Sequence, residues 1–451
     1  MAAEKPHPPL LTAGIDDAIL ETSASIEPQS LDLLCELTIA AGEGREAIDD
    51  VTASAMTALG VQMEHIDYAP RAVPLVDEFA AETMASTAAD RCIIGRLPGD
   101  GGGRSLLLFA HPDTEEAQAA PAWETDPFSP TVKDDRLFGW GVADDLAGLA
   151  MLVQGVHLLK AANLRPKGDL VLVSAPSKKH RRGIAAALHR GISADAAIYL
   201  HPAESGRGLD EIKAYAPGQL EFMIMVRGQQ PDTAEPAHTA FAHQAVNPFE
   251  KALSIAAALK AVDENRGRDR RHPTMQQAIG RSTNLMLTNC DVGSYDQLSR
   301  MPSTCRFGGA LTLIPGEGLE EVMSSVEEAL GAAAQRDDWL RDNPPIVEWL
   351  AGVSAAETDQ ASDLYLTVAG VLKHLGATPK VNPLHTSSDI RNPIVQKGMP
   401  TVGFGPRCGG LTMAGKTDEW VDITDFHRAV LATALVIAAW CGVATSSGSY
   451  R

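Results

Sequence analysis

Short runs of consecutive apolar residues recur through the first half of the chain, and each ends in polar residues. Three of them predict buried strands, within residues 105–113, 168–176 and 194–202. Helical periodicity separates them, for example at 146–164, and an earlier helix is predicted to begin at Ser30. Strands that alternate with helices predict an α/β fold, with a mostly parallel sheet flanked by helices. In such sheets, ligands bind at the carboxyl ends of the strands.

The pattern changes near residue 216. Two alternating runs and two amphipathic helices follow one another there, at 219–228, 247–262, 304–316 and 318–335. This order predicts an inserted α+β domain. A sheet-type run returns at 401–406, before a final helix. We therefore expect a main domain in two parts, with one insertion between them: 1–215, then the insertion 216–335, then 336–451.

Composition and charge narrow the function. The chain has 451 residues, of which 45% are hydrophobic and 21% charged, as in ordinary globular proteins. Its length predicts two or three domains. The formal net charge of −20 argues against binding to nucleic acid and against docking on anionic membranes.

The cysteines and the N-terminal residues indicate the cellular compartment in which we expect the protein. The six cysteines show no metal-ligand or redox spacing, which favours free thiols in a reducing compartment. The first twenty residues lack the pattern of a signal peptide. The apolar segment 429–444 is the single membrane candidate, and its length and alanine content favour a buried closing helix. We expect a cytoplasmic protein that does not span a membrane.

Polar residues at three predicted strand or loop ends are candidates for chemistry. They are His111 with Asp113, the pair Asp144 and Asp145 before a helix, and His201. Two imidazoles and one carboxylate that meet at one sheet edge would suit zinc or another divalent first-row metal. Asp113 would then orient the His111 ring. By themselves, the same residues also fit a polar loop pair and a helix N-cap.

A longer match favours the metal site. The segment from "LLLFAHPD" through "DPF" to "GWGVADDLAG" resembles the core signature of the zinc-dependent aminoacylase, carboxypeptidase G, tripeptidase and desuccinylase family. "HTAFAHQAVNPF" resembles the segment of that family's lid that carries a histidine, and "SSDIR" with "KGMPTVGFGP" resembles its late catalytic segment. The resemblance covers nearly the whole chain. It implies a catalytic domain that holds two metal ions and an inserted lid, or dimerisation, domain.

The resemblance places one metal set on this sequence. His111 matches the first-metal histidine, Asp144 the bridging aspartate and Asp113 the aspartate that orients the histidine. The family usually has an acidic residue where this chain has His201. The implied first site is therefore His111, Asp144 and His201, for zinc or another divalent ion.

The second metal site departs from the family pattern. Its glutamate falls on Lys179, its histidine on Gly415, and the glutamate that serves as general base falls on Lys178. An ammonium group cannot accept a proton unless its pKa is strongly lowered. The sequence therefore predicts at most one metal ion per protomer, and a chain without metal is the alternative.

Substrate groups of the lid also differ. The lid arginine, which the resemblance assigns to substrate binding, falls on Thr312, and the lid asparagine falls on Ser299. His238 and Arg391 remain as anion or oxyanion contacts. The resemblance further implies a homodimer formed through the lid domain, in which His238 reaches the partner's cleft. It also implies closure about hinges near residues 215 and 335.

Three interpretations of function remain open. The first is a divergent hydrolase with one metal that acts on an amide, a peptide or an amino-acid derivative, with Lys178 or Lys179 as base or nucleophile. The second is a non-catalytic or non-hydrolytic protein that binds a small ligand, with a lysine ammonium in place of the second cation. The third is a two-metal hydrolase in which other groups supply the missing ligands, the candidates being His180, Glu204, Asp210 and Glu211.

Overall fold

A computed structural model describes residues 14–80, 87–113, 123–177, 180–203, 205–385, 388–411 and 416–445. The chain folds into two compact units. The first comprises Met1–Pro74, Glu82–Ala216 and Glu357–Arg451, and the second comprises Leu75–Ala81 and Pro217–Ala356. Each unit has its own hydrophobic core.

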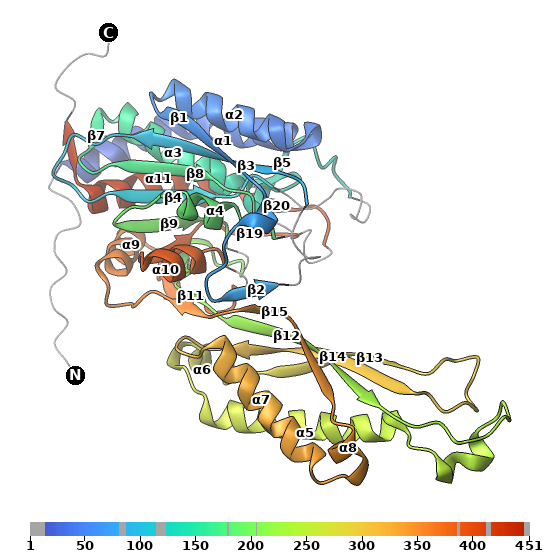
Figure 1. Ribbon diagram of the computed structural model, residues 1–451. Coiled ribbons are helices and arrows are strands. Elements are labelled where there is room, and N and C mark those ends of the chain that lie inside the picture. Colours follow the sequence, from blue (N-terminus) through green and yellow to red (C-terminus); the bar gives the residue numbers. More distant parts are fainter. Residues whose placement is uncertain are drawn as a thin grey trace. The chain divides into compact units, whose positions relative to one another are not determined.

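The first unit is built on a six-stranded sheet (Figure 1). In spatial order its strands are β1 (Gln62–Tyr68), β3 (Asp90–Leu97), β8 (Leu170–Ser174), β4 (Leu106–Ala110), β9 (Ala196–Leu200) and β18 (Thr401–Phe404). The four strands from β8 to β18 are parallel, and β1 and β3 extend the sheet in antiparallel pairing. The predicted α/β class and the three predicted strands are confirmed.

Helices cover both faces of this sheet. Alternate residues of a strand point to opposite faces, and in β4 Leu106 and Leu108 join one core while Leu107 and Phe109 join another. The helices that pack in the first core include α1 (Ile15–Glu43), α2 (Arg45–Ala58), α3 (Ala147–Ala161), α9 (Asp363–His374) and α11 (Ile423–Cys441). The second core contains α4 (Gly183–His189) and the residues that flank α10 (Arg391–Lys397).

Short strands complete the first unit. β19 (Cys408–Gly409), β20 (Trp420–Asp422), β6 (Arg136–Phe138) and β5 (Thr131–Lys133) form a four-stranded sheet, while β7 (Leu164–Pro166) pairs with β21 (Val443–Thr445) and β10 (Glu211–Ile212) with β17 (Lys380–Val381). Two further short strands, β11 (Tyr215–Ala216) and β16 (Ala356–Glu357), pair where the chain passes between the units.

The first helix is longer than the sequence pattern predicted. We expected it to begin at Ser30, but α1 is continuous from Ile15 to Glu43 and includes Pro28. The Ser30 hydroxyl donates to the Ile26 carbonyl at 2.8 Å within the helix, so Ser30 is not an N-cap. The helix continues because its buried stripe extends on both sides of the proline, from Ile19 to Leu37, and this burial outweighs the loss of one backbone hydrogen bond.

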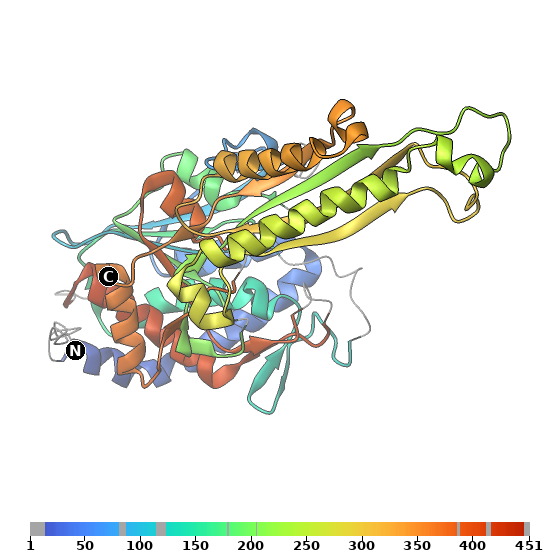
Figure 2. The same cartoon turned by 90° about the horizontal axis from the view of Figure 1, so that it is seen from below.

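The second unit is a five-stranded antiparallel sheet with two helices on one face (Figure 2). Its strands in order are β13 (Leu285–Val292), β14 (Thr304–Leu313), β12 (Gly218–Arg227), β15 (Ile346–Val353) and β2 (Glu78–Ala80). Its helices are α5 (Pro248–Asp269), α6 (Pro273–Ile279), α7 (Leu319–Ala334) and α8 (Asp338–Asp342). The unit extends past the predicted boundary at 335, because β15 pairs along most of β12 and β2 then pairs with β15.

Two helical segments are long and apolar enough to cross a membrane by length and composition, Val142–Ala161 and Ile423–Cys441. In their most apolar windows, 94% and 72% of the residues are buried inside the protein. Such burial is what core helices of a soluble protein show. The second segment overlaps the candidate at 429–444 and is the buried closing helix that its composition predicted.

Candidate metal centre

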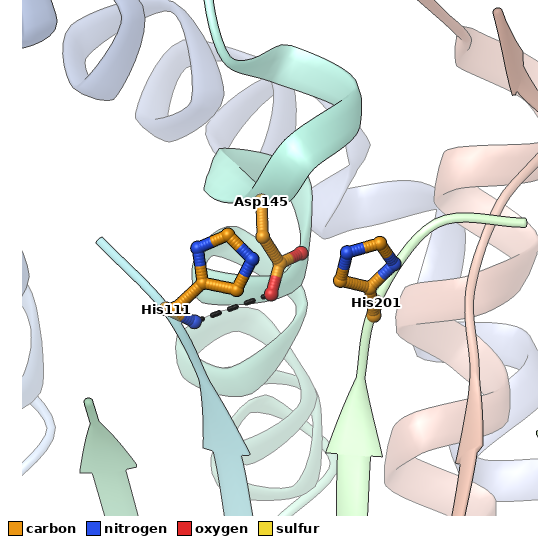
Figure 3. A group of neighbouring side chains, drawn as sticks. All are labelled: His111, Asp145 and His201. Carbon is orange, nitrogen blue, oxygen red and sulfur yellow. Dashed lines mark hydrogen bonds between the residues drawn. The ribbon is translucent and has the colours of Figure 1, made fainter. Parts of the chain in front are cut away.

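Three separate elements bring polar side chains to one edge of the main sheet (Figure 3). His111 follows β4 and His201 follows β9, and these two strands are parallel neighbours. Asp144 and Asp145 lie in the turn Val142–Leu146 that precedes α3. All four residues are buried, with exposures of 3%, 2%, 5% and 0% respectively. The predicted meeting of the strand ends is therefore present.

The two imidazole rings point their Nε2 atoms at the same carboxylate oxygen. The Oδ1 atom of Asp144 lies 3.0 Å from His111 Nε2 and 3.2 Å from His201 Nε2. The Nδ1 atoms point the other way, to the carbonyl oxygen of Asp113 at 3.0 Å and of Pro202 at 2.9 Å. Because a carbonyl oxygen only accepts, each Nδ1 carries a hydrogen. In a neutral ring the Nε2 atom then has the lone pair with which an imidazole binds a metal ion.

Asp145 also belongs to this group, although in a different way. Donor atoms of His111, Asp145 and His201 lie within 4.8 Å of one another. Its Oδ2 accepts the backbone N–H of His111 at 3.2 Å (Figure 3). Its Oδ1 accepts the backbone N–H of Gly148, also at 3.2 Å. Asp145 therefore ties the turn to β4 and α3, whereas Asp144 faces both rings. The choice of Asp144 as the ligand remains a prediction, and this contrast supports it.

The group holds excess negative charge in a buried place. Burial lowers the pKa of His111, but hydrogen bonds to Asp113 and Asp144 outweigh it and leave that pKa well above its usual value. Burial, partly opposed by His111, raises the pKa of Asp145 well above its ordinary range, and Asp144 adds to the rise. Both directions mean that the site favours extra positive charge. A divalent cation would supply that charge, and the two nitrogen donors and one carboxylate fit zinc or a similar ion.

Neighbouring groups fix the donors. The Asp113 carboxylate lies 3.4 Å from His111 Nδ1 and accepts the Ser177 N–H at 2.8 Å, so it helps to orient the ring while the Asp113 carbonyl makes the shorter contact. Glu419, which is fully buried, accepts the N–H of Ala143 at 2.7 Å and holds the turn that carries Asp144. Such supporting contacts are typical of metal sites.

An ion network extends from the centre to α2. Arg181 Nε lies 3.9 Å from Asp113, and its NH1 group lies 2.9 Å from Asp90. Asp90 also pairs with Arg45 at 2.6 Å, and Arg45 pairs with Asp49 at 3.0 Å. Burial raises the pKa of Asp49 to about 6, although Arg45 opposes the rise.

This pKa predicts how Asp49→Asn changes stability with pH. A raised carboxyl pKa favours the folded state at low pH, and this contribution is lost as the pH rises through about 6. The ionised carboxylate therefore costs stability above that pH. We expect Asp49→Asn to be more stable than the wild type, with an advantage that grows by about 1 kcal/mol between roughly pH 5 and pH 8. Arg45 keeps Asp90 as partner in the variant. Urea unfolding at both pH values measures the effect, and an advantage that does not change with pH would contradict it.

The lysine pair cannot be placed, because Lys178, Lys179 and Gly415 lie outside the described residues. The preceding residue is fixed: Ser177 donates its backbone N–H to Asp113 and its hydroxyl to Asp389 at 2.6 Å. The other proposed substitutes for the second-metal ligands do not join the centre, as far as the described part of the chain shows. His180 and Asp210 are exposed, Glu211 pairs with Lys213 at 3.5 Å, and Glu204 lies outside the described residues.

The predicted substrate groups are divided between the two units. In the second unit, His238 is buried, its N–H donates to the Ser299 carbonyl at 2.8 Å, and its Nδ1 accepts the Met301 N–H at 3.2 Å. A neutral His238 ring therefore carries its hydrogen on Nε2, as an anion contact needs. The hydroxyl of Thr312, on β14, accepts the Asn284 N–H at 2.8 Å. Arg391 begins α10 in the first unit and is 4% exposed.

Two residues near the centre were missed by sequence reasoning. The ring of His385 lies 5.1 Å from that of His201. Asp389 is the carboxylate that accepts the Ser177 hydroxyl, and burial raises its pKa. Asp389 lies in the segment "SSDIR", which resembles the late catalytic segment of the family, and His385 lies just before it. Histidine and aspartate within a segment that matches a catalytic domain were the available signal.

Fold and centre together define an α/β protein with a metal-type His–Asp–His group at the strand ends and an inserted antiparallel unit. Residues 107–439 match the model of Peptidase family M20/M25/M40. The chain belongs to this family.

Named relatives agree with this assignment. The chain is 25% identical over 357 residues to an N-formyl-4-amino-5-aminomethyl-2-methylpyrimidine deformylase of Halalkalibacterium halodurans, covering 75% of this chain and 79% of the relative. It is 29% identical over 327 residues to a succinyl-diaminopimelate desuccinylase of Thioalkalivibrio sulfidiphilus, covering 71% and 80%. A dinuclear metal-binding M20 peptidase of Bacillus subtilis has a similar fold, with a TM-score of 0.59, 12% identity and coverage of 92% and 99%.

Proposed function

We propose that this chain is a metal-dependent hydrolase that cleaves an amide bond in a small amino-acid or peptide-like molecule. The observation that carries the proposal is the convergence of two imidazole Nε2 atoms on the Asp144 carboxylate in a buried site. Both named relatives remove an acyl group, a formyl or a succinyl group, from an amine according to their names. That common chemistry supports an N-acylated amine as the substrate class.

In this proposal one divalent ion is held by His111, Asp144 and His201. Zinc fits the donor set, and when bound it would supply Lewis-acid polarisation of the scissile carbonyl. Asp113 and Glu419 hold the His111 ring and the aspartate turn in place. The centre lies at the carboxyl ends of β4 and β9, where ligands of such sheets bind.

Proton transfer falls to the lysine pair in this proposal. Lys178 stands where the family has its general base, and Lys179 follows it. A lysine accepts a proton from water only if a neighbouring cation or burial lowers its pKa, and the metal ion would be that cation. Ser177 is held by Asp113 and Asp389 and so anchors the start of this loop beside the centre. His238 and Arg391 are each proposed as a contact for a substrate carboxylate or the developing oxyanion. Ser299 and Thr312 stand at the two lid positions that the resemblance assigns to substrate binding.

Hydrolysis by the metal-loaded protein is the test. Metal-replete protein is incubated with N-formyl, N-acetyl and N-succinyl amino acids and with dipeptides, and the released primary amine is quantified. We expect release from at least one class, loss of that activity after chelation and recovery with zinc. A protein that binds metal but releases no amine from any class would contradict the proposal. That result would favour a non-catalytic protein that binds a small ligand, which the comparisons do not favour.

We further propose that the chain is a cytoplasmic homodimer formed through the second unit. Among the described strands, β13 pairs only with β14 and so leaves one edge open. Beside it an apolar groove of about 350 Å³ is lined by residues that include Phe249, Leu253 and Leu287. Leu253 is 56% exposed and Met286, on β13, is 61% exposed. An open strand edge beside an apolar helix face is a surface that a second copy would cover.

Leu253→Asp tests the dimer. A charge placed in this groove is expected to shift the protein from dimer to monomer in analytical ultracentrifugation, because a buried unpaired carboxylate opposes association. Leu366→Asp is the matched control, since Leu366 is 40% exposed on α9 of the first unit. A wild-type monomer, or equal dissociation in both variants, would contradict the proposed surface.

A further inference from the structure

Lys213 is a fully buried lysine directly behind His201. Its side chain has 0% exposure. Its backbone is locked to β18 by two hydrogen bonds with Gly403, each of 2.7 Å. The ammonium group therefore projects from backbone that is hydrogen-bonded to the edge strand of the main sheet.

The ammonium group makes three contacts. Nζ donates to the carbonyl oxygen of His201 at 3.1 Å and to that of Pro202 at 2.7 Å, and it lies 3.5 Å from Glu211 Oε1. Two of its N–H donors are used by the carbonyl oxygens, and Glu211 supplies the opposite charge as an ion pair. Burial of such a charge is costly unless it is paired and hydrogen-bonded. A site that only needed to fill space would be served by an apolar side chain of similar length.

One of these acceptors is shared with the imidazole ring. The Pro202 carbonyl oxygen accepts both the Lys213 ammonium and the Nδ1–H of His201, the latter at 2.9 Å. That second bond sets the ring's tautomer and directs Nε2 toward Asp144. Lys213 also donates to the carbonyl oxygen of His201 itself. It therefore holds two successive backbone carbonyls, those of His201 and Pro202.

We propose that Lys213 is a positioning residue for the metal centre, which holds the His201–Pro202 carbonyls so that His201 presents Nε2 to the ion. This inference rests on the proposed function, because the proposed function assigns a metal ion to His201. Lys213 touches neither substrate nor metal and acts through the Pro202 carbonyl. Without its ammonium group the carbonyl would turn, the Nδ1 bond would weaken and the ring would lose its fixed direction.

Lys213→Met tests the inference, because methionine keeps a similar volume without donors. Cobalt is the probe: Co²⁺ is titrated into the metal-free full-length chain, and its visible absorption spectrum and affinity are recorded. We expect about a 10- to 100-fold loss of affinity and a changed band shape, because supporting contacts to metal ligands have effects of that size. Lys251→Met, which removes a half-buried lysine paired with Asp337 in the second unit, should keep wild-type affinity and spectrum.

The outcomes separate the two proposals. A wild-type chain that binds no Co²⁺ would overturn the metal centre itself. A folded Lys213→Met that binds Co²⁺ with wild-type affinity and spectrum would overturn the positioning role and leave the proposed function standing. If Lys213→Met does not fold, Lys213→Gln serves instead, because its polar amide suits the buried site but is uncharged and one bond shorter, so it cannot hold both carbonyls as the ammonium group does. We expect weakened binding there as well, and wild-type binding would again overturn the inference.

Discussion

Asp144→Asn is expected to lose tight metal binding. Its carboxylate is the group that both imidazole Nε2 atoms approach, at 3.0 and 3.2 Å. An amide oxygen is a weaker ligand than a carboxylate and brings no negative charge to a buried divalent ion. We expect zinc affinity to fall by more than about 100-fold, beyond what loss of a supporting contact causes. Competition with a chromophoric chelator measures the affinity.

Asp145→Asn is the matched control. An asparagine oxygen still accepts a hydrogen bond from the backbone N–H of His111 or Gly148, which are the contacts that Asp145 makes. Its effect on zinc affinity should therefore be the smaller of the two. A larger loss in Asp145→Asn than in Asp144→Asn would exchange the roles assigned to the two aspartates.

Gly148→Ala is expected to destabilise the first unit and to weaken metal binding together. Gly148 lies in the first turn of α3, where the helix packs against Leu200 at the end of β9. An added Cβ would overlap the Leu200 carbonyl oxygen and the Asp145 carboxylate, whose Cγ would lie 2.8 Å away. Neither is the free end of a flexible side chain: one is backbone and the other is held by two N–H groups. We expect a loss of about 3 kcal/mol in the free energy of unfolding, at the upper end of overpacking effects.

Gly331→Ala is the control for this substitution. Gly331 lies in α7, and a Cβ there would meet nothing within 4 Å. Alanine should stabilise the helix by up to about 1 kcal/mol. Urea unfolding and zinc titration of both variants measure the contrast. An unchanged zinc affinity in a folded Gly148→Ala would show that the close contact does not position the centre.

The sequence predicted best those features that depend on a short segment alone, or on the order of segments along the chain. The apolar runs that became β4, β8 and β9 could be recognised because strands covered on both faces are apolar throughout. Because parallel strands end at one edge, His111 and His201 could be expected to meet.

Other features depend on packing between distant segments. β13 and β15 were missed because β13 is mostly exposed and β15 only half-buried, so neither shows clear alternation. The positions of His385 and Lys213 beside His201 depend on contacts that no local pattern records. The same holds for the continuation of α1 through Pro28, which follows from the stripe that the main core covers.

Metal content per protomer is the most direct test of the account. Elemental analysis of protein purified without added metal, then of protein equilibrated with zinc and freed of excess, gives the number of ions bound. The account predicts one zinc or similar ion per chain, held by His111, Asp144 and His201. Two ions per chain would show that a second site exists despite Lys179 and Gly415. No ion after equilibration with zinc would contradict the metal centre, and with it the proposed hydrolase.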